Sequence, residues 1–135
     1  MGKDDMIIES GQKWAIDTAW LAGNNRSLAA MAASGLCPKC RKKLRIDQVE
    51  PKANDVLKAV KSCCSKSPDY VTGGMPLQES IFRVFLANGN QPMTLDELGN
   101  QLNDRRGIDA YRTSVNVLSR LMTSDQHYGL KVVTG

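Results

Sequence analysis

Four cysteines constrain the fold of this 135-residue chain more than any other feature. Cys37 and Cys40 form a C-x₂-C pair around Pro38 and Lys39, whereas Cys63 and Cys64 are adjacent. The opening residues, "MGKDDMIIES", lack the basic and then apolar pattern of a secretory signal, so we expect a cytoplasmic location. In that reducing compartment cysteines serve as metal ligands or redox groups more often than as disulfides.

The two cysteine pairs together predict one structural zinc site. Zn²⁺ prefers four tetrahedral ligands, and a C-x₂-C turn presents two thiolates to a single ion. The predicted ligands are Cys37, Cys40, Cys63 and Cys64. The stretch "LCPKCRKKL" resembles the knuckle of zinc-ribbon and treble-clef proteins. The second pair departs from that resemblance, because those families use another C-x₂-C and this chain has "CC".

Three alternatives to a four-cysteine zinc site stay open. Water or the single histidine, His127, replaces one member of the adjacent pair as a ligand. The four thiols are unrelated buried groups. The adjacent pair acts in redox chemistry or as a soft-metal sensor, although the flanking residues lack the βαβ context of thioredoxin-like motifs.

The excess positive charge of the chain lies in its first half. Residues 1–70 contain 12 basic and 8 acidic side chains, and residues 71–135 contain 6 of each. Because a four-thiolate zinc site carries a formal charge of 2−, we expect the basic residues around the first pair to compensate it; contact of this run with nucleic acid is the alternative. These residues are Lys39, Arg41, Lys42, Lys43 and Arg45.

The first half is predicted to be a helical module. Residues 10–22 are apolar over a wide arc, which predicts a buried helix, and residues 26–34 predict a second helix that completes a helical hairpin. Residues 43–49 alternate between apolar and polar side chains and predict a short strand. Residues 51–62 have helical spacing and deliver the adjacent cysteines at their end.

A segment rich in Ser, Pro and Gly divides the chain near Gly73 and Gly74. We therefore predict a zinc-binding helical module over residues 1–72 and a second domain over residues 75–135.

Three helices and an extended segment are predicted after this division. Pro76 opens the first helix, and "TLDE" predicts a capping box in which Thr94 and Glu97 satisfy each other's backbone N–H. The third helix begins near Thr113, and a turn and an apolar segment follow it. This order resembles the winged helix-turn-helix superfamily over residues 76–133. The resemblance implies that the third helix enters the major groove of DNA and that a β-ribbon lies near the DNA backbone.

Seven residues are candidates for contact with double-stranded DNA on this resemblance. Asn and Arg side chains suit base edges, and arginines in the preceding turn suit phosphates. The zero net charge of residues 71–135 argues against strong phosphate binding and leaves a protein partner open. The candidates are Arg105, Arg106, Arg112, Thr113, Asn116, Val117 and Arg120.

The sequence as a whole predicts a mainly α protein with a small β part: a helical hairpin with a Cys₄ zinc site, then a winged helix. It offers no nucleophile–base pair and no open three-ligand metal site, so we expect no enzyme and no small-molecule substrate. No apolar run approaches the ~20 residues of a membrane span. The predicted function is a DNA-binding transcriptional regulator or accessory factor; the alternatives are a protein–protein interaction module with a structural zinc and a thiol or soft-metal sensor.

Overall fold

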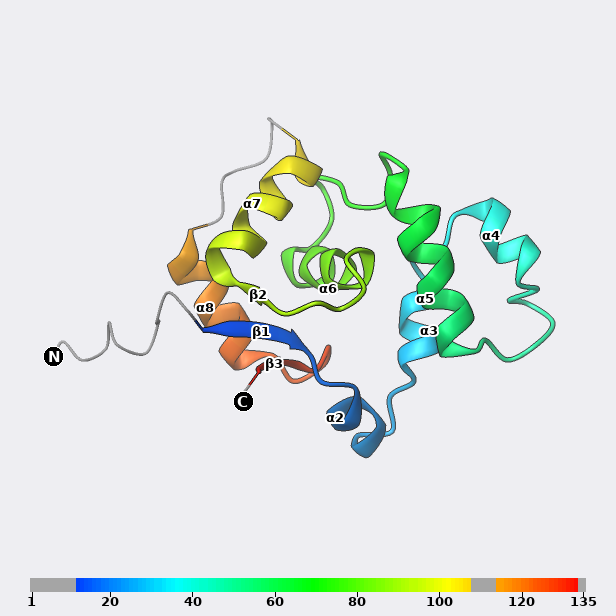
Figure 1. Ribbon diagram of the computed structural model, residues 1–135, viewed down its shortest axis with the longest axis horizontal. Helices are drawn as coiled ribbons and strands as arrows, with labels where there is room; N and C mark the ends of the chain where they lie inside the picture. Colours follow the sequence, from blue (N-terminus) through cyan, green and yellow to red (C-terminus); the bar gives the residue numbers. More distant parts are fainter. Residues whose placement is uncertain (1–11, 108–113, 134–135) are drawn as a thin grey trace, which may run out of the picture.

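The computed structural model describes residues 12–107 and 114–133 (Figure 1). The fold is mainly helical with one small antiparallel sheet, which confirms the predicted mixture of elements. Within the described ranges no helix combines the length and the apolar character needed to cross a membrane. In chain order the elements are β1 (Lys13–Ile16), α2 (Thr18–Gly23), α3 (Leu28–Ala33), α4 (Pro38–Lys43), α5 (Ala53–Ser62), the 3₁₀ helix η1 (Cys64–Lys66), α6 (Leu77–Ala87), β2 (Met93–Thr94), α7 (Leu95–Arg106), α8 (Val115–Ser124) and β3 (Leu130–Val132).

β1 replaces the first part of the helix predicted over residues 10–22, so that prediction is wrong over residues 13–16. Asp17 separates β1 from α2: its backbone N–H donates to the Gly129 carbonyl at 2.7 Å, and its side chain accepts from the Trp20 N–H as an N-cap. A short apolar run fits a buried strand as well as a buried helix, and the pairing partners of β1 decide between them.

The strand predicted over residues 43–49 is also wrong. Lys43 ends α4, and the residues after it turn back, with Arg45 at a φ of 56° in the left-handed region. Leu44 and Ile46 still pack against the hydrophobic core, as their alternation indicated. The turn therefore places both apolar side chains against the core, as a strand with alternating side chains would also do.

The three helices predicted in the second half are present as α6, α7 and α8. The capping box at the start of α7 is confirmed: the Glu97 N–H donates to Thr94 Oγ1 at 3.2 Å, and the Thr94 N–H donates to Glu97 Oε1 at 2.9 Å. Ser114 caps α8 by accepting from the Val117 N–H at 3.2 Å. The buried side chains of these helices include Ile81, Phe85, Leu98, Leu102, Leu118 and Met122.

β1 is the central strand of the sheet, which has the order β2-β1-β3. Trp14 pairs with Met93 of β2 on one side and with Val132 of β3 on the other, both antiparallel. The extended segment predicted after α8 thus finds its partner at the beginning of the chain. The division into residues 1–72 and 75–135 stays a prediction. It would place β1 in the first domain and its pairing partners, β2 and β3, in the second.

α6 lies between two groups of elements (Figure 1). The sheet, α7 and α8 lie on one side of it, and α3, α4 and α5 lie on the other. The buried apolar side chains of both groups belong to one hydrophobic cluster, which includes Val56 and Val60 of α5 as well as Leu98 of α7. The cysteines lie on the side of α3, α4 and α5.

Candidate metal centre

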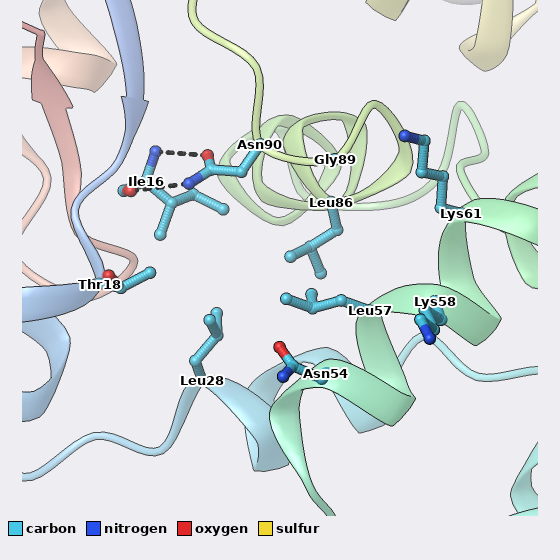
Figure 2. Close-up of a pocket in the computed structure, with 10 residues that line it drawn as sticks. All are labelled: Ile16, Thr18, Leu28, Asn54, Leu57, Lys58, Lys61, Leu86, Gly89 and Asn90. Carbon is cyan, nitrogen blue, oxygen red and sulfur yellow. Dashed lines mark hydrogen bonds between the residues drawn. The ribbon is translucent and has the colours of Figure 1, made fainter.

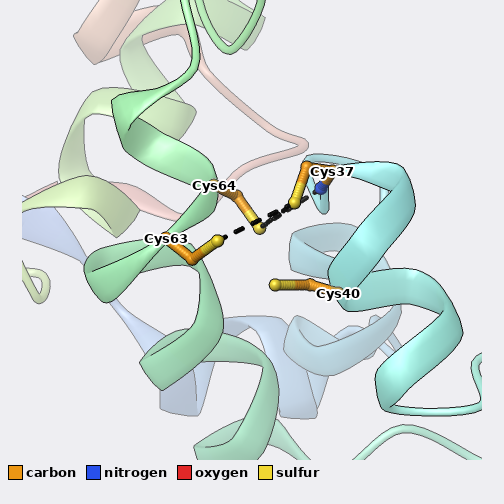
Figure 3. A group of neighbouring side chains, drawn as sticks. All are labelled: Cys37, Cys40, Cys63 and Cys64. Atoms are coloured by element: carbon orange, nitrogen blue, oxygen red, sulfur yellow. Dashed lines mark hydrogen bonds between the residues drawn. The ribbon is translucent and has the colours of Figure 1, made fainter.

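Two short segments bring the four cysteines together. Cys37 is the N-cap of α4, Pro38 begins that helix, and Cys40 lies in its first turn. Cys63 ends α5 with φ −132° and ψ −65°, and Cys64 begins η1. Adjacent side chains on a regular α-helix point about 100° apart, since 3.6 residues complete a turn. The break at Cys63 lets both members of the pair face α4 (Figure 3).

The spacing of the four sulfur atoms is compatible with one tetrahedral metal ion. Cys37 Sγ lies 3.5 Å from Cys64 Sγ and 4.0 Å from Cys63 Sγ, and all four Sγ atoms lie within 4.8 Å of one another. A tetrahedral zinc site with Zn–S bonds of ~2.3 Å requires S···S distances of about 3.8 Å. The residues present therefore fit a four-thiolate metal site, as the spacing of the cysteines predicted.

Burial and hydrogen bonding differ among the thiols. Cys40 and Cys64 are buried, whereas Cys37 and Cys63 are partly exposed, and all four are free of disulfides. The Cys40 N–H and the Cys64 thiol hydrogen-bond to the Cys37 sulfur and lower the pKa of Cys37 to about 7. Burial raises the pKa of Cys40 to about 12 and also raises that of Cys64. Metal binding must displace the protons of the buried thiols, so zinc affinity depends on pH.

The basic residues around Cys37 and Cys40 divide into two kinds. Arg41 donates to the Ala33 carbonyl at 3.0 Å and lies 3.8 Å from an Asp47 carboxylate oxygen. Arg45 Nε donates to Gln48 at 3.1 Å. The three lysines of the run are exposed on α4; they are Lys39, Lys42 and Lys43.

His127 is not a member of this cluster. Its Nδ1 lies 2.9 Å from the Arg26 guanidinium, and its ring packs edge-on against Tyr128 with centroids 4.6 Å apart. The group of ligand atoms within 4.8 Å contains the four cysteines alone among the described residues. The alternative of a Cys₃His site loses its support.

Arg105 and Arg106, two of the candidate DNA contacts, bind other parts of the chain. Arg105 donates to the Ser65 carbonyl at 2.8 Å and lies over the Tyr70 ring at 5.7 Å from its centroid. Arg106 bonds to the Ser80 hydroxyl at 2.9 Å and to two loop carbonyls, those of Met75 at 2.9 Å and Gly73 at 3.1 Å. Both arginines therefore fix the segment between η1 and α6 onto α7.

The remaining candidates lie on α8 or outside the described residues. Asn116 and Arg120 are exposed on α8, and Val117 is partly exposed. Arg112 and Thr113 lie in residues 108–113, which are outside the described part of the chain. Asn116 and Arg120 are therefore the candidates that the structure shows as exposed polar side chains on α8.

Tyr70 connects the cysteine segment to α6, and sequence reasoning missed it. Its hydroxyl donates to the Arg83 carbonyl at 2.7 Å, and Arg83 donates back to the Tyr70 carbonyl at 2.9 Å. The Tyr70 ring is flanked by the guanidinium groups of Arg83, 5.6 Å from its centroid, and Arg105. A single tyrosine in a polar loop offers no periodic signal, so only the folded arrangement reveals this connection.

Comparisons of the chain with protein-family models, with curated proteins and with solved structures found no match. The cysteine cluster and the exposed face of α8 are therefore the features that bear on function.

Proposed function

We propose that this protein is a non-enzymatic, zinc-stabilised winged helix-turn-helix protein that contacts double-stranded DNA through α8, as a cytoplasmic transcriptional regulator or accessory factor. The observation that carries the zinc part is the convergence of four Sγ atoms within 4.8 Å. Tetrahedral sulfur ligation suits zinc or iron, and the closed set of four protein ligands suits a structural ion.

The order of elements supports the winged-helix part of the proposal. α6, β2, α7, α8 and β3 follow one another in the order expected for that superfamily, with β1 supplying the strand between β2 and β3. α8 exposes Asn116 and Arg120, whose side chains hydrogen-bond to adenine and guanine edges in known major-groove complexes.

Elemental analysis and a DNA-binding titration test the two parts separately. We expect one zinc per chain after purification without added metal. Affinity for duplex DNA should fall steeply between about 50 and 200 mM salt, because phosphate neutralisation releases counterions. Arg120→Ala should weaken binding about tenfold, which is the scale of one base contact.

Lys43→Ala is the matched control, because it removes one exposed positive charge from α4 rather than from α8. Its effect on affinity should be less than about twofold at physiological salt. A zinc-loaded protein that binds no duplex even at about 50 mM salt would remove the DNA part and leave the metal part intact.

A protein-docking module is the second candidate. The contacts of Arg105 and Arg106 with backbone carbonyls favour it. These contacts occupy guanidinium N–H groups that were expected to bind phosphates. On this alternative the exposed face of α8 binds a folded partner. Salt dependence separates the two candidates, because a protein interface of ordinary polarity lacks the steep slope of phosphate binding.

A further inference from the structure

A cavity of about 300 Å³ lies where the cysteine-bearing helices meet α6 and β1, apart from both the metal centre and α8. The elements around it are β1, α2, α3, α5 and α6 with the turn that follows it (Figure 2). Ten residues line it: Ile16, Thr18, Leu28, Asn54, Leu57, Lys58, Lys61, Leu86, Gly89 and Asn90. Its volume is at the lower end of the range for small-molecule pockets.

The floor of this cavity is aliphatic. Ile16 and Leu86 are buried, and the side chains of Leu28 and Leu57 converge on the same space from α3 and α5 (Figure 2). Leu28 and Leu57 remain partly exposed in the folded chain. Covering them with a ligand would remove further apolar surface from water, at about 25 cal/mol for each Å².

The polar atoms at the cavity are not equally available to a ligand. The Asn90 side chain is fully engaged, since its Oδ1 accepts from the Ile16 N–H at 2.9 Å and its Nδ2 donates to the Ile16 carbonyl at 3.0 Å. Asn54 on the first turn of α5 is exposed. The turn at Asn90 is therefore structural, and the exposed polar side chains at the cavity are those of α5 and of Thr18 on α2.

Two lysines give the mouth of the cavity a positive charge. Lys58 and Lys61 are exposed on α5, and none of the described residues that line the cavity carries a carboxylate. Neither lysine forms an ion pair within the described residues. Gly89, at a φ of 76°, leaves room for the Lys61 side chain, since a Cβ there would lie 3.3 Å from Lys61 Nζ. Both ammonium groups therefore remain free to pair with an anion.

We propose that this cavity binds a small amphiphile with an anionic head, of the class of straight-chain carboxylates with about eight carbons. At the ~30 Å³ that one water molecule occupies in the liquid, 300 Å³ accommodates roughly ten non-hydrogen atoms, which matches an octanoate ion. The aliphatic chain lies against Leu28, Leu57 and Leu86, and the carboxylate pairs with Lys58 and Lys61. The inference is independent of the proposed contact between α8 and DNA.

Calorimetric titration of the full, metal-loaded chain with octanoate tests this proposal. We expect one saturable site per chain at concentrations below those at which octanoate forms micelles. The uncharged analogue 1-octanol and the cationic octylammonium should each bind at least about tenfold more weakly, since neither supplies the anion. Amide shifts in an NMR titration should concentrate in α3, α5 and the turn at residues 88–90.

Two variants separate the head and tail contributions. Lys58→Glu combined with Lys61→Glu changes exposed side chains only and should weaken octanoate binding about tenfold or more without altering the fold. Leu57→Trp should block the cavity. Lys43→Glu makes one such charge reversal on α4, outside the cavity, and should leave the affinity within about twofold of the parent.

Three results would overturn the proposal. They are the absence of a saturable site for octanoate, equal affinity for octanoate and 1-octanol, and equal weakening by Lys43→Glu and by the paired α5 variant. The second and third would show that the lysines of α5 do not recognise the head group.

Discussion

Cys63 is the residue on which the geometry of the metal centre depends. Its backbone leaves helical values at the end of α5, so the thiols of two consecutive residues face the same cluster of sulfur atoms. Cys64 is almost fully buried, at 1% exposed, whereas Cys63 is partly exposed. Each of the two adjacent thiols thus offers one Sγ atom to the cluster, but Cys64 is packed in the core and Cys63 is only partly buried against it.

Single replacements of the adjacent cysteines should affect metal and stability to different extents. We expect Cys63→Ser and Cys64→Ser each to lower zinc affinity by more than about tenfold, because each removes one ligand. Cys64→Ser should also lower the thermal midpoint further, since it places a hydroxyl in an apolar site. Chelator competition and thermal unfolding measure the two effects.

Ser62→Ala is the matched control for these replacements, because Ser62 precedes the pair and its hydroxyl donates to the Lys58 carbonyl rather than to a cysteine. It should keep the parent zinc affinity. A Cys63→Ser protein that stays folded and fully zinc-loaded would contradict four-cysteine ligation. A folded Cys63→Ser protein that no longer binds metal would instead favour the sensor alternative.

At the scale of elements, α7 shows how far the sequence determines local structure. The Thr94 and Glu97 pair predicted its first residues because the capping box is a contact between residues three apart. β1 and the turn after α4 could not be predicted in this way. The partners of β1 lie in β2 and β3, far along the chain, and non-local pairing overrides local preference.

The candidate site likewise has one part that local sequence predicted and one part that it did not. The cysteine spacing predicted that the four thiols would cluster, because metal geometry demands few arrangements of thiolates. The contacts of Arg105 and Arg106 were not predictable, since their acceptors include backbone carbonyls of Ser65 and Gly73. Nothing in a side-chain pattern indicates where a loop carbonyl will point.

The capping box of α7 should give the stability of the protein a defined pH dependence. The Thr94 N–H donates to the Glu97 carboxylate and lowers the pKa of Glu97 below its ordinary value of 4.5. A carboxylate with a lowered pKa contributes stability above pH 4.5, and that contribution is lost as the pH falls through the folded-state pKa. The stability difference between the parent and Glu97→Gln should therefore be largest near pH 7 and shrink toward pH 3.

Urea unfolding at several pH values measures this difference. Asp96→Asn is the control, because it neutralises an exposed acid in the same turn that has no part in the capping box. Thr94→Ala should cost about 1 kcal/mol at any of these pH values, the usual scale of an N-cap. A Glu97→Gln difference that grows as the pH falls would contradict the assigned role.

At the scale of the whole molecule, an ion bound by the four cysteines would join α4 to the end of α5 and to η1. The segment after Cys64 reaches α6 through Tyr70 and α7 through Arg105. Loss of a bound ion would remove the link between α4 and the segment of Cys63 and Cys64, so we expect these two segments to loosen before the packed face of α6 and α7.

Chelation should lower the thermal midpoint by more than about 10 °C, because closed zinc sites supply roughly 10 kcal/mol of apparent binding free energy. Hydrogen exchange should quicken first at residues 37–43 and 63–70, and later in α7. Re-addition of zinc should restore both measurements. A metal-free protein with the parent midpoint and exchange pattern would show that the cluster is not structural.

The position of β1 at the centre of the sheet has a consequence for how the chain is made. A ribosome releases residues 13–16 early, at a rate of about 5–20 residues per second, but both edges of that strand stay unpaired until β2 and then β3 have emerged. The cysteine-bearing helices, in contrast, are complete well before that time. During synthesis α3, α4, α5 and η1 can thus fold before the sheet forms. Until β2 and β3 pair with β1, Trp14 and Ile16 remain in contact with water or with a chaperone.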